Sequence, residues 1–178
     1  MKRFAIIVAG GQGIRMQGTL PKQFLPLEGE PVLLHTLRRF HLPGIEIILV
    51  MNAGYISYWN DLCKELSHVP EHTLVPGGTS RALSVLNGLK SIQGDGLVAI
   101  HDAVRPLCSA ALIERLFDEC EQKGSAIPVI PVKDTLRLIS NEGSTTVPRE
   151  QYRAVQTPQV FRLNALLEAF SIPDVERY

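Results

Sequence analysis

Short apolar runs alternate along this chain with longer segments in which apolar residues recur at helical spacing, and this alternation constrains the fold most. Apolar runs occupy residues 3–9, 45–51 and 97–101, and an unbroken run is typical of a strand covered on both faces. Between them, segments such as 32–40 place their apolar residues along one face of a helix. The pattern predicts a Rossmann-like α/β fold, with a mostly parallel twisted sheet and helices on both faces.

The rest of the chain fits the same scheme. The further expected elements are a helix over 56–66, a strand over 72–75, a helix capped by Thr79 or Ser80, a helix from Ser109 to Gly124, a strand over 126–132 and a short helix over 163–170. Pro128 and Pro131 indicate that the strand over 126–132 lies at an edge or carries a bulge. Trp59 has core spacing, and His35, His41, His68 and His72 have no ligand spacing and are expected at the surface or as caps.

Composition excludes several classes of protein. With 178 residues, 45% of them hydrophobic, the chain can form one domain with a sizeable core. Lysine plus arginine and aspartate plus glutamate both total 18, so no overall basic field draws the protein to nucleic acid or to a membrane. The first apolar run is too short to span a membrane and lacks a credible signal cleavage site. Cys63, Cys108 and Cys120 are spaced like reduced thiols, which indicates a cytoplasmic protein.

A glycine-rich loop follows the first strand. It holds Gly10, Gly11 and Gly13, so backbone amides can approach an anion closely, and Arg15 and Lys22 supply two nearby cations. The loop matches neither the dinucleotide fingerprint nor the Walker pattern. The glycines alone also fit a turn that merely needs flexible residues, but the two cations favour a polyphosphate site.

A second group of polar residues follows the strand at 97–101. Asp102, expected just past the end of that strand, is a candidate ligand for Mg²⁺, which prefers one or two carboxylates plus phosphate oxygens. Alternatively, Asp102 caps the turn before Pro106 and pairs with Arg105. His101 is expected to be a core residue, and the turn at Gly77 and Gly78 brings a third loop to the same edge of the sheet.

No recognisable nucleophile accompanies these groups, because neither Ser80, Ser84 nor any cysteine has a partner arrangement for covalent catalysis. Cations, a carboxylate and glycine loops point instead to phosphoryl or nucleotidyl transfer, where the substrate brings its own nucleophile.

The pattern changes over residues 133–155. Residues 135–139 and 145–147 flank a turn at Asn141 to Gly143, which predicts an amphipathic hairpin. This segment is too polar for a core, so we expect it to project from the domain and hold a partner chain.

Several motifs together resemble the 2-C-methyl-D-erythritol 4-phosphate cytidylyltransferase family of non-mevalonate isoprenoid synthesis. They are Ala9 to Met16, Pro21 to Gln23, Gly77 to Ser84, His101 to Pro106, Lys133 to Thr135 and Gln156 to Gln159. In that family the phosphate of the substrate attacks the α-phosphorus of CTP in line and pyrophosphate leaves, with Mg²⁺ bridging the triphosphate. The resemblance therefore implies CTP, a polyol phosphate and Mg²⁺, in a homodimer joined by hairpin arms.

The resemblance also implies roles for individual residues. Arg15 and Lys22 would stabilise the transition state. Nucleotide binding would fall to Ala9, Gly10, Gly11, Gly13, Gly78, Ser84 and Ala103. Substrate binding would fall to Asp102, which would also hold the metal, to Arg105 and Thr157, and to Thr135 and Arg149 acting across the dimer interface.

Three departures from the family pattern stand out. Gly10 lies where alanine is frequent, and Thr79 lies where an acidic residue can contact the nucleotide. The family also continues into a strand whose lysine helps to bind the phosphates, whereas this sequence ends at Tyr178. We expect the chain to be shortened relative to a longer gene product; the alternative is an impaired activity.

Two rival functions follow from the same motifs. Ribitol 5-phosphate cytidylyltransferases share nearly all of them, so the polyol stays open. A non-catalytic nucleotide-binding homologue would also keep the loops, although it could tolerate the loss of Arg15 and Lys22.

Overall fold

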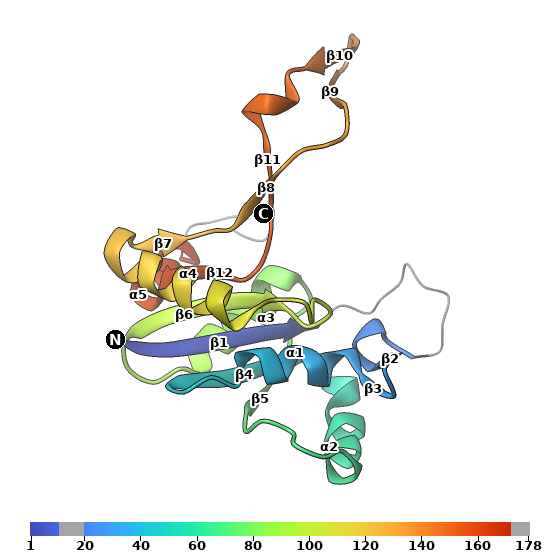
Figure 1. The fold of residues 1–178 in the computed structure, drawn as a ribbon, viewed down its shortest axis with the longest axis vertical. Helices are drawn as coiled ribbons and strands as arrows, with labels where there is room; N and C mark the ends of the chain where they lie inside the picture. The colour runs from blue at the N-terminus through green and yellow to red at the C-terminus, as the bar shows by residue number, and fades with distance from the viewer. Residues whose placement is uncertain (11–19, 172–178) are drawn as a thin grey trace.

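A six-stranded sheet forms the centre of the protein. The computed structural model describes residues 1–10 and 20–171. The strand order is β5 (Thr73–Pro76), β4 (Ile45–Met51), β1 (Lys2–Ala9), β6 (Gly96–Asp102), β12 (Gln159–Arg162) and β7 (Ser125–Ala126). The first four strands are parallel, while β12 runs antiparallel to both β6 and β7. The predicted α/β fold with a mostly parallel sheet is confirmed (Figure 1).

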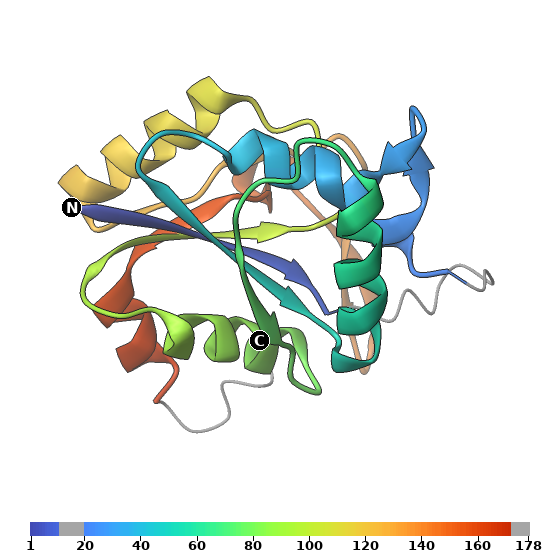
Figure 2. The ribbon, with the colours of Figure 1, turned by 90° about the horizontal axis from the view of Figure 1, so that it is seen from below.

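Helices cover both faces of this sheet. Figure 2 shows α1 (Val32–Phe40) and α4 (Ala110–Lys123) on one side and α3 (Arg81–Ser91) and α5 (Leu163–Ala169) on the other. The helix α2 (Ile56–Glu65) adds the fully buried Trp59 to the core on the α1 side, as its spacing predicted. Among the described residues, none of the helices combines the length and the apolar character needed to cross a membrane.

Strand β1 is apolar without interruption from Phe4 to Ala9, because both of its faces are covered. Phe4 and Ile6 pack in the core under α3 and α5, whereas Ala5 and Ile7 pack in the core under α1 and α4. Successive side chains of a strand point to opposite faces, so a strand covered on both faces needs apolar residues at every position.

The helix ends are fixed by residues that the sequence predicted. Ser80 accepts a hydrogen bond on its hydroxyl oxygen from the Leu83 amide, and Ser109 does the same for Leu112. Gly124 ends α4 in the left-handed region at φ +90°, where glycine carries no steric penalty. These caps set where α3 and α4 begin, and α3 begins beside the carboxyl ends of the parallel strands.

A long excursion leaves the body between β7 and β12 (Figure 1). It rises through β8 (Val129–Pro131), forms the antiparallel hairpin β9 (Leu136–Ser140) and β10 (Gly143–Val147), and returns through β11 (Arg153–Val155), which pairs with β8. The expected hairpin is confirmed, and we call residues 129–155 the arm.

The structure corrects three local expectations. The single strand expected over 126–132 is two strands, because β7 pairs with β12 in the body while β8 pairs with β11 in the arm, with Pro128 between them. Asp102 is the last residue of β6 rather than a residue beyond it. His72 is half-buried and accepts a hydrogen bond from the Trp59 indole at 3.0 Å, so it is part of the packing around α2. A short pair, β2 (Pro26–Leu27) and β3 (Glu30–Pro31), was not predicted.

Candidate functional site

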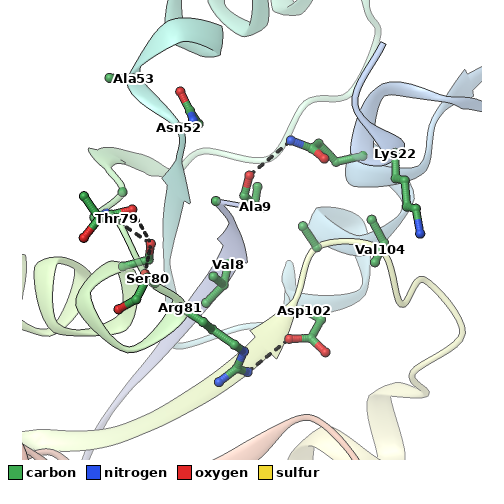
Figure 3. A pocket seen from close by; sticks show the side chains of 16 residues that line it. Val8, Ala9, Lys22, Asn52, Ala53, Thr79, Ser80, Arg81, Asp102 and Val104 are labelled. Atoms are coloured by element: carbon green, nitrogen blue, oxygen red, sulfur yellow. Dashed lines mark hydrogen bonds and ion pairs between the residues drawn. The ribbon is translucent and has the colours of Figure 1, made fainter. Parts of the chain in front are cut away.

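A cavity of about 840 Å³ lies at the carboxyl ends of the parallel strands. It is lined by residues 8–10, 22–23, 52–53, 77–81 and 102–104 and by Ser84. Ligands of parallel α/β sheets bind at this edge, where the loops after several strands meet. Figure 3 shows Lys22 on one side of the cavity, Thr79 and Ser80 on the opposite side, and Asp102 between them.

One wall of the cavity consists of closely packed backbone. The Gly77 amide donates to the Met51 carbonyl at 2.7 Å, and the Gly78 amide donates to the Ser84 hydroxyl at 3.1 Å. The Ser84 hydroxyl in turn donates to the Ser80 carbonyl at 2.8 Å. Ser84 therefore fixes this wall, and one lone pair of its hydroxyl oxygen stays available to a ligand.

Neighbouring atoms come very close to the glycines of this wall, and at Gly78, beside Leu83, they leave no room for a side chain. A β-carbon on Gly10 would lie 2.9 Å from the Ser84 hydroxyl oxygen, and one on Gly78 would lie 2.5 Å from the Leu83 β-carbon. The predicted residues Ala9, Gly10, Gly78, Ser84 and Ala103 all line the one cavity. Gly11, Gly13 and Arg15 lie outside the described residues.

Lys22 lines the cavity and begins a short 3₁₀ turn, Lys22–Phe24. The other two residues of this turn are buried and hold it in place. Gln23 is only 3% exposed and donates from Nε2 to the Ala9 carbonyl at 3.1 Å. Phe24 is equally buried and packs against Tyr55, Tyr58 and Trp59. Within residues 1–10 and 20–171, the Lys22 ammonium has no hydrogen bond or ion pair.

Asp102 receives one arginine on each carboxylate oxygen. Arg81 donates to Oδ1 at 3.0 Å and Arg105 donates to Oδ2 at 2.8 Å. Partial burial alone would raise the pKa of Asp102, but the two guanidinium groups together hold that pKa below its usual range. The predicted pairing of Asp102 with Arg105 is confirmed. Asp102 also lines the cavity, and its role as a metal ligand stays a prediction.

The loop after Asp102 is tied to the core. The Ala103 amide donates to the Val8 carbonyl at 3.1 Å, and the fully buried Thr36 hydroxyl donates to the Ala103 carbonyl at 2.8 Å. His101 is fully buried, as expected; its Nε2 bonds the Arg105 carbonyl at 3.0 Å, and burial lowers its pKa. A neutral His101 donates from Nε2 here, so the imidazole orients the loop.

Arg105 also connects the cavity with the base of the arm. Its Nη1 donates to the Gln156 side-chain oxygen at 3.0 Å, and the Gln156 amide donates to the Pro128 carbonyl at 2.9 Å. Thr157 follows directly, before a cis peptide bond to Pro158. The structure thus brings Arg105 and the segment containing Thr157 together.

Four of the predicted substrate residues are not among those that line the cavity: Arg105, Thr157, Thr135 and Arg149. Arg105 lies next to the cavity, because it bonds the lining residue Asp102. Thr135 and Arg149 are exposed on the arm, where Arg149 donates to the Lys133 carbonyl. Their contribution to the site of a partner subunit stays a prediction.

The described residues contain no group of three or more histidine, cysteine, aspartate or glutamate side chains that could hold a metal ion. Among the described residues that line the cavity, Asp102 is the one acidic residue.

Cys108 is buried, which raises the pKa of its thiol to about 11 and keeps it protonated at neutral pH.

Three residues that shape the site had no predicted role: Gln23, Thr36 and Arg81. Gln23 and Arg81 lie within the motifs Pro21 to Gln23 and Gly77 to Ser84. Their partners Ala9, Ala103 and Asp102 are distant in sequence, so spacing alone gives no signal for these contacts.

Known proteins resemble this chain over most of its length. The model of the 2-C-methyl-D-erythritol 4-phosphate cytidylyltransferase family matches residues 4–176. The enzymes of that name from Phocaeicola vulgatus and Bacteroides thetaiotaomicron are 45% and 46% identical over 172 residues, which are 96% of this chain and 78% of each relative.

Solved structures agree with this match. The cytidylyltransferase of that name from Thermus thermophilus superimposes with a TM-score of 0.74 at 32% identity, covering 96% of this chain and 75% of that one. The 4-diphosphocytidyl-2C-methyl-D-erythritol synthase from Anaerococcus prevotii gives 0.78 at 28% identity, covering 96% and 76%. With its glycine-walled cavity, its lysine turn and these matches in both sequence and structure, the chain belongs to the 2-C-methyl-D-erythritol 4-phosphate cytidylyltransferase family.

Proposed function

We propose that this protein transfers the cytidylyl group of CTP to 2-C-methyl-D-erythritol 4-phosphate in non-mevalonate isoprenoid biosynthesis. The observation that carries the proposal is the single cavity in which the glycine wall, Lys22 and the Asp102 cluster meet. An oxygen of the substrate phosphate forms a bond to the α-phosphorus, the bond from that phosphorus to the β-phosphate bridge breaks, and pyrophosphate leaves. No protein nucleophile is needed, because the substrate phosphate attacks directly.

The cytidine part of CTP belongs, in this proposal, against the glycine wall. Ala9, Gly10, Gly78, Ser84 and Ala103 would contact the nucleotide. Support comes from their position, because all five line the cavity, at the ends of β1 and β6 and around the start of α3. Gly11 and Gly13 would add further amides around the triphosphate.

Charge stabilisation is assigned to Lys22 and Arg15. Negative charge spreads over the transferred phosphoryl group and the departing pyrophosphate in the transition state. Lys22 supports this role because it lines the cavity and belongs to a turn with buried anchors. A preoriented cation needs little reorganisation during the reaction.

Asp102 suits a divalent ion such as Mg²⁺. Each of its oxygens accepts one arginine hydrogen bond and keeps a further lone pair, and Mg²⁺ is commonly held by one carboxylate together with substrate phosphates. Asp102 would hold the ion, which would neutralise charge on the triphosphate. Arg81 and Arg105 orient that carboxylate toward the cavity.

The polyol phosphate is assigned to residues from two subunits of a homodimer. Asp102, Arg105 and Thr157 would come from one subunit, and Thr135 and Arg149 from the arm of its partner. The arm supports a dimer because Leu138 and Ile139 are 61% and 73% exposed, and a two-stranded hairpin is marginal in water without a covering surface.

The free thiols of Cys63, Cys108 and Cys120 support a cytoplasmic location.

Product analysis tests the reaction itself. Phosphorus NMR of the protein with Mg²⁺, CTP and 2-C-methyl-D-erythritol 4-phosphate should show a new diphosphate diester and pyrophosphate in equal amounts. The same mixture with UTP should react more slowly. Release of inorganic monophosphate instead would mean hydrolysis and would contradict the proposed transfer.

A further inference from the structure

Gln23 is a buried polar side chain beside the proposed catalytic lysine. It is 3% exposed, it lines the cavity, and its Nε2 donates to the Ala9 carbonyl 14 residues earlier, at 3.1 Å. Figure 3 shows this bond reaching from the Lys22 segment to the end of β1. Ala9 is the last residue of β1 and precedes Gly10 of the glycine wall.

The lysine turn has few other links to the sheet. Its internal bonds run from the Phe24 amide to the Pro21 carbonyl and from the Leu25 amide to the Lys22 carbonyl. A bond from the Val32 amide to the Leu25 carbonyl joins the segment to α1. Phe24 packs against Tyr55 of the 3₁₀ turn Ala53–Tyr55 and against α2. In the part of the chain that the structure describes, the Gln23 amide makes the one hydrogen bond between residues 20–25 and β1.

The apolar packing of Phe24 and the hydrogen bond of Gln23 constrain the turn in different ways. Apolar packing through Phe24 holds the turn against the body of the protein but is nondirectional, so it tolerates small sliding. A hydrogen bond with one donor, one acceptor and a required angle fixes the turn relative to the end of β1. The end of β1 is also the start of the wall that would hold the nucleotide.

We propose that Gln23 is a positioning residue that fixes Lys22 relative to the nucleotide. The proposal rests on the proposed cytidylyl transfer. Gln23 acts through Lys22 in this account: it keeps the lysine ammonium where charge develops on the phosphates. Misplacing a catalytic group by about 1 Å can cost on the order of 100-fold in rate, even when the group itself is retained.

A double-mutant cycle tests this assignment. Gln23→Met keeps the length of the side chain and removes the donor, and it is combined with Lys22→Ala. Each protein is assayed for pyrophosphate release in single turnovers with enzyme in excess, so that slow rates are measurable, and CTP affinity is measured by calorimetry. Circular dichroism gives the folded fraction, to which each rate is normalised.

We expect Gln23→Met to lower the rate by about 10- to 100-fold while the Kd for CTP changes by less than about 3-fold. In the Lys22→Ala background the same change should cost less than about 2-fold, because the group that Gln23 positions is already gone. A normal rate for Gln23→Met, or an equal loss in both backgrounds, overturns the proposal. Should the methionine variant fold poorly, Gln23→Asn removes the contact by shortening the side chain and carries the same expectations.

Asn87 offers a matched control. Its Nδ2 donates to the Pro76 carbonyl at 3.0 Å, so Asn87→Leu removes the same kind of bond at a half-buried site outside the cavity. Any effect of Asn87→Leu on the rate should be equal in the wild-type and Lys22→Ala backgrounds, without the coupling expected for Gln23. A wild-type protein that releases no pyrophosphate overturns the proposed function and this inference with it, whereas an active wild type with an additive Gln23 cycle overturns the inference alone.

Discussion

Asp102 places a negative charge between two arginines in a chain whose formal net charge is zero. Arg81 and Arg105 place two positive charges on this carboxylate, and Lys22 adds a third at the cavity. The described part of the site is therefore locally positive, although the protein as a whole is not. Local charge of this kind attracts a triphosphate without drawing the protein to nucleic acid.

Replacing Lys22 tests its role as a stabiliser of the transition state. We expect Lys22→Ala to lower kcat by about 100- to 1000-fold, with little change in CTP affinity, because removing one preoriented charge-stabilising group costs about that much. Steady-state kinetics and calorimetry measure the two quantities. Lys64→Ala, which removes an exposed lysine paired with Asp61, should leave both unchanged. Unchanged turnover in the folded Lys22 variant would refute the assigned role.

The Glu30–Arg38 ion pair makes stability depend on pH. Arg38 donates to both carboxylate oxygens of Glu30, and these hydrogen bonds are the main reason that the pKa of Glu30 is lowered. A lowered pKa in the folded state adds stability at neutral pH that is lost as the pH falls through that pKa.

Glu30→Gln should therefore lower the melting temperature at pH 7, and the difference from wild type should close as the pH falls through the lowered pKa of Glu30, where its carboxyl group becomes protonated. Thermal unfolding of both proteins, from pH 7 into the acid range, measures the difference in melting temperature. Glu46→Gln, which changes an exposed carboxylate without an ion pair among the described residues, should show no such convergence. A pH-independent difference for Glu30→Gln would contradict the linkage.

Among single residues, the sequence predicts those whose role follows from their own type and from their near neighbours in the chain. Lys22 and the turn at Gly78 are recognisable because glycine turns and nearby cations are visible in a short stretch, whereas Ser84 is assigned only through the family resemblance. The contacts of Gln23, Thr36 and Arg81 are not recognisable in this way, because a hydrogen bond to a residue 14 to 67 positions away depends on the tertiary fold.

Helix α3 lies so close to the sheet that it needs glycine at position 88. A β-carbon on Gly88 would lie 2.9 Å from a Val50 methyl and 3.0 Å from an Ile6 methyl. Gly88→Ala should lower the free energy of unfolding by about 1–3 kcal/mol, because overpacking outweighs the better helix propensity of alanine.

Urea unfolding measures this effect, with the exposed Lys90→Ala in the same helix as the control, expected to stay within about 0.5 kcal/mol. A stabilised Gly88→Ala protein would mean that α3 can move away from the sheet at no cost.

The arm is the element that would join two chains. Replacing Leu138 and Ile139 together with lysine should convert the proposed dimer to a monomer, because charged side chains cannot be buried unpaired in an apolar interface. Sedimentation velocity measures the change. Leu107→Lys makes a similar substitution at an 89% exposed position on the body and should leave the dimer intact. A wild-type monomer would contradict the proposed contribution of Thr135 and Arg149 from a partner.

Element types followed from the sequence because apolar periodicity and caps such as Ser80, Ser109 and Gly124 are local signals. The division of 126–132 into β7 and β8 did not follow, because each half pairs with a different strand. Strand pairing is a property of the assembled chain, so the positions of the prolines could locate the irregularity but not its partners.

For the whole molecule, the parallel topology places the ends of β1, β4, β5 and β6 at one edge, and this explains why motifs far apart in the sequence form one cavity. Alternating strands and helices predicted this edge. The strand order, with β1 between β4 and β6 and β12 returning antiparallel, could not be read from the pattern, because many orders satisfy the same alternation.

The central claim is that this cavity carries out cytidylyl transfer to a specific polyol phosphate. The most direct measurement is Mg²⁺-dependent pyrophosphate release from CTP, with 2-C-methyl-D-erythritol 4-phosphate and ribitol 5-phosphate compared under identical conditions. We expect release that needs the polyol phosphate and is faster with 2-C-methyl-D-erythritol 4-phosphate. Faster release with ribitol 5-phosphate would contradict the assigned substrate, and CTP binding without release from either would contradict the assigned catalysis.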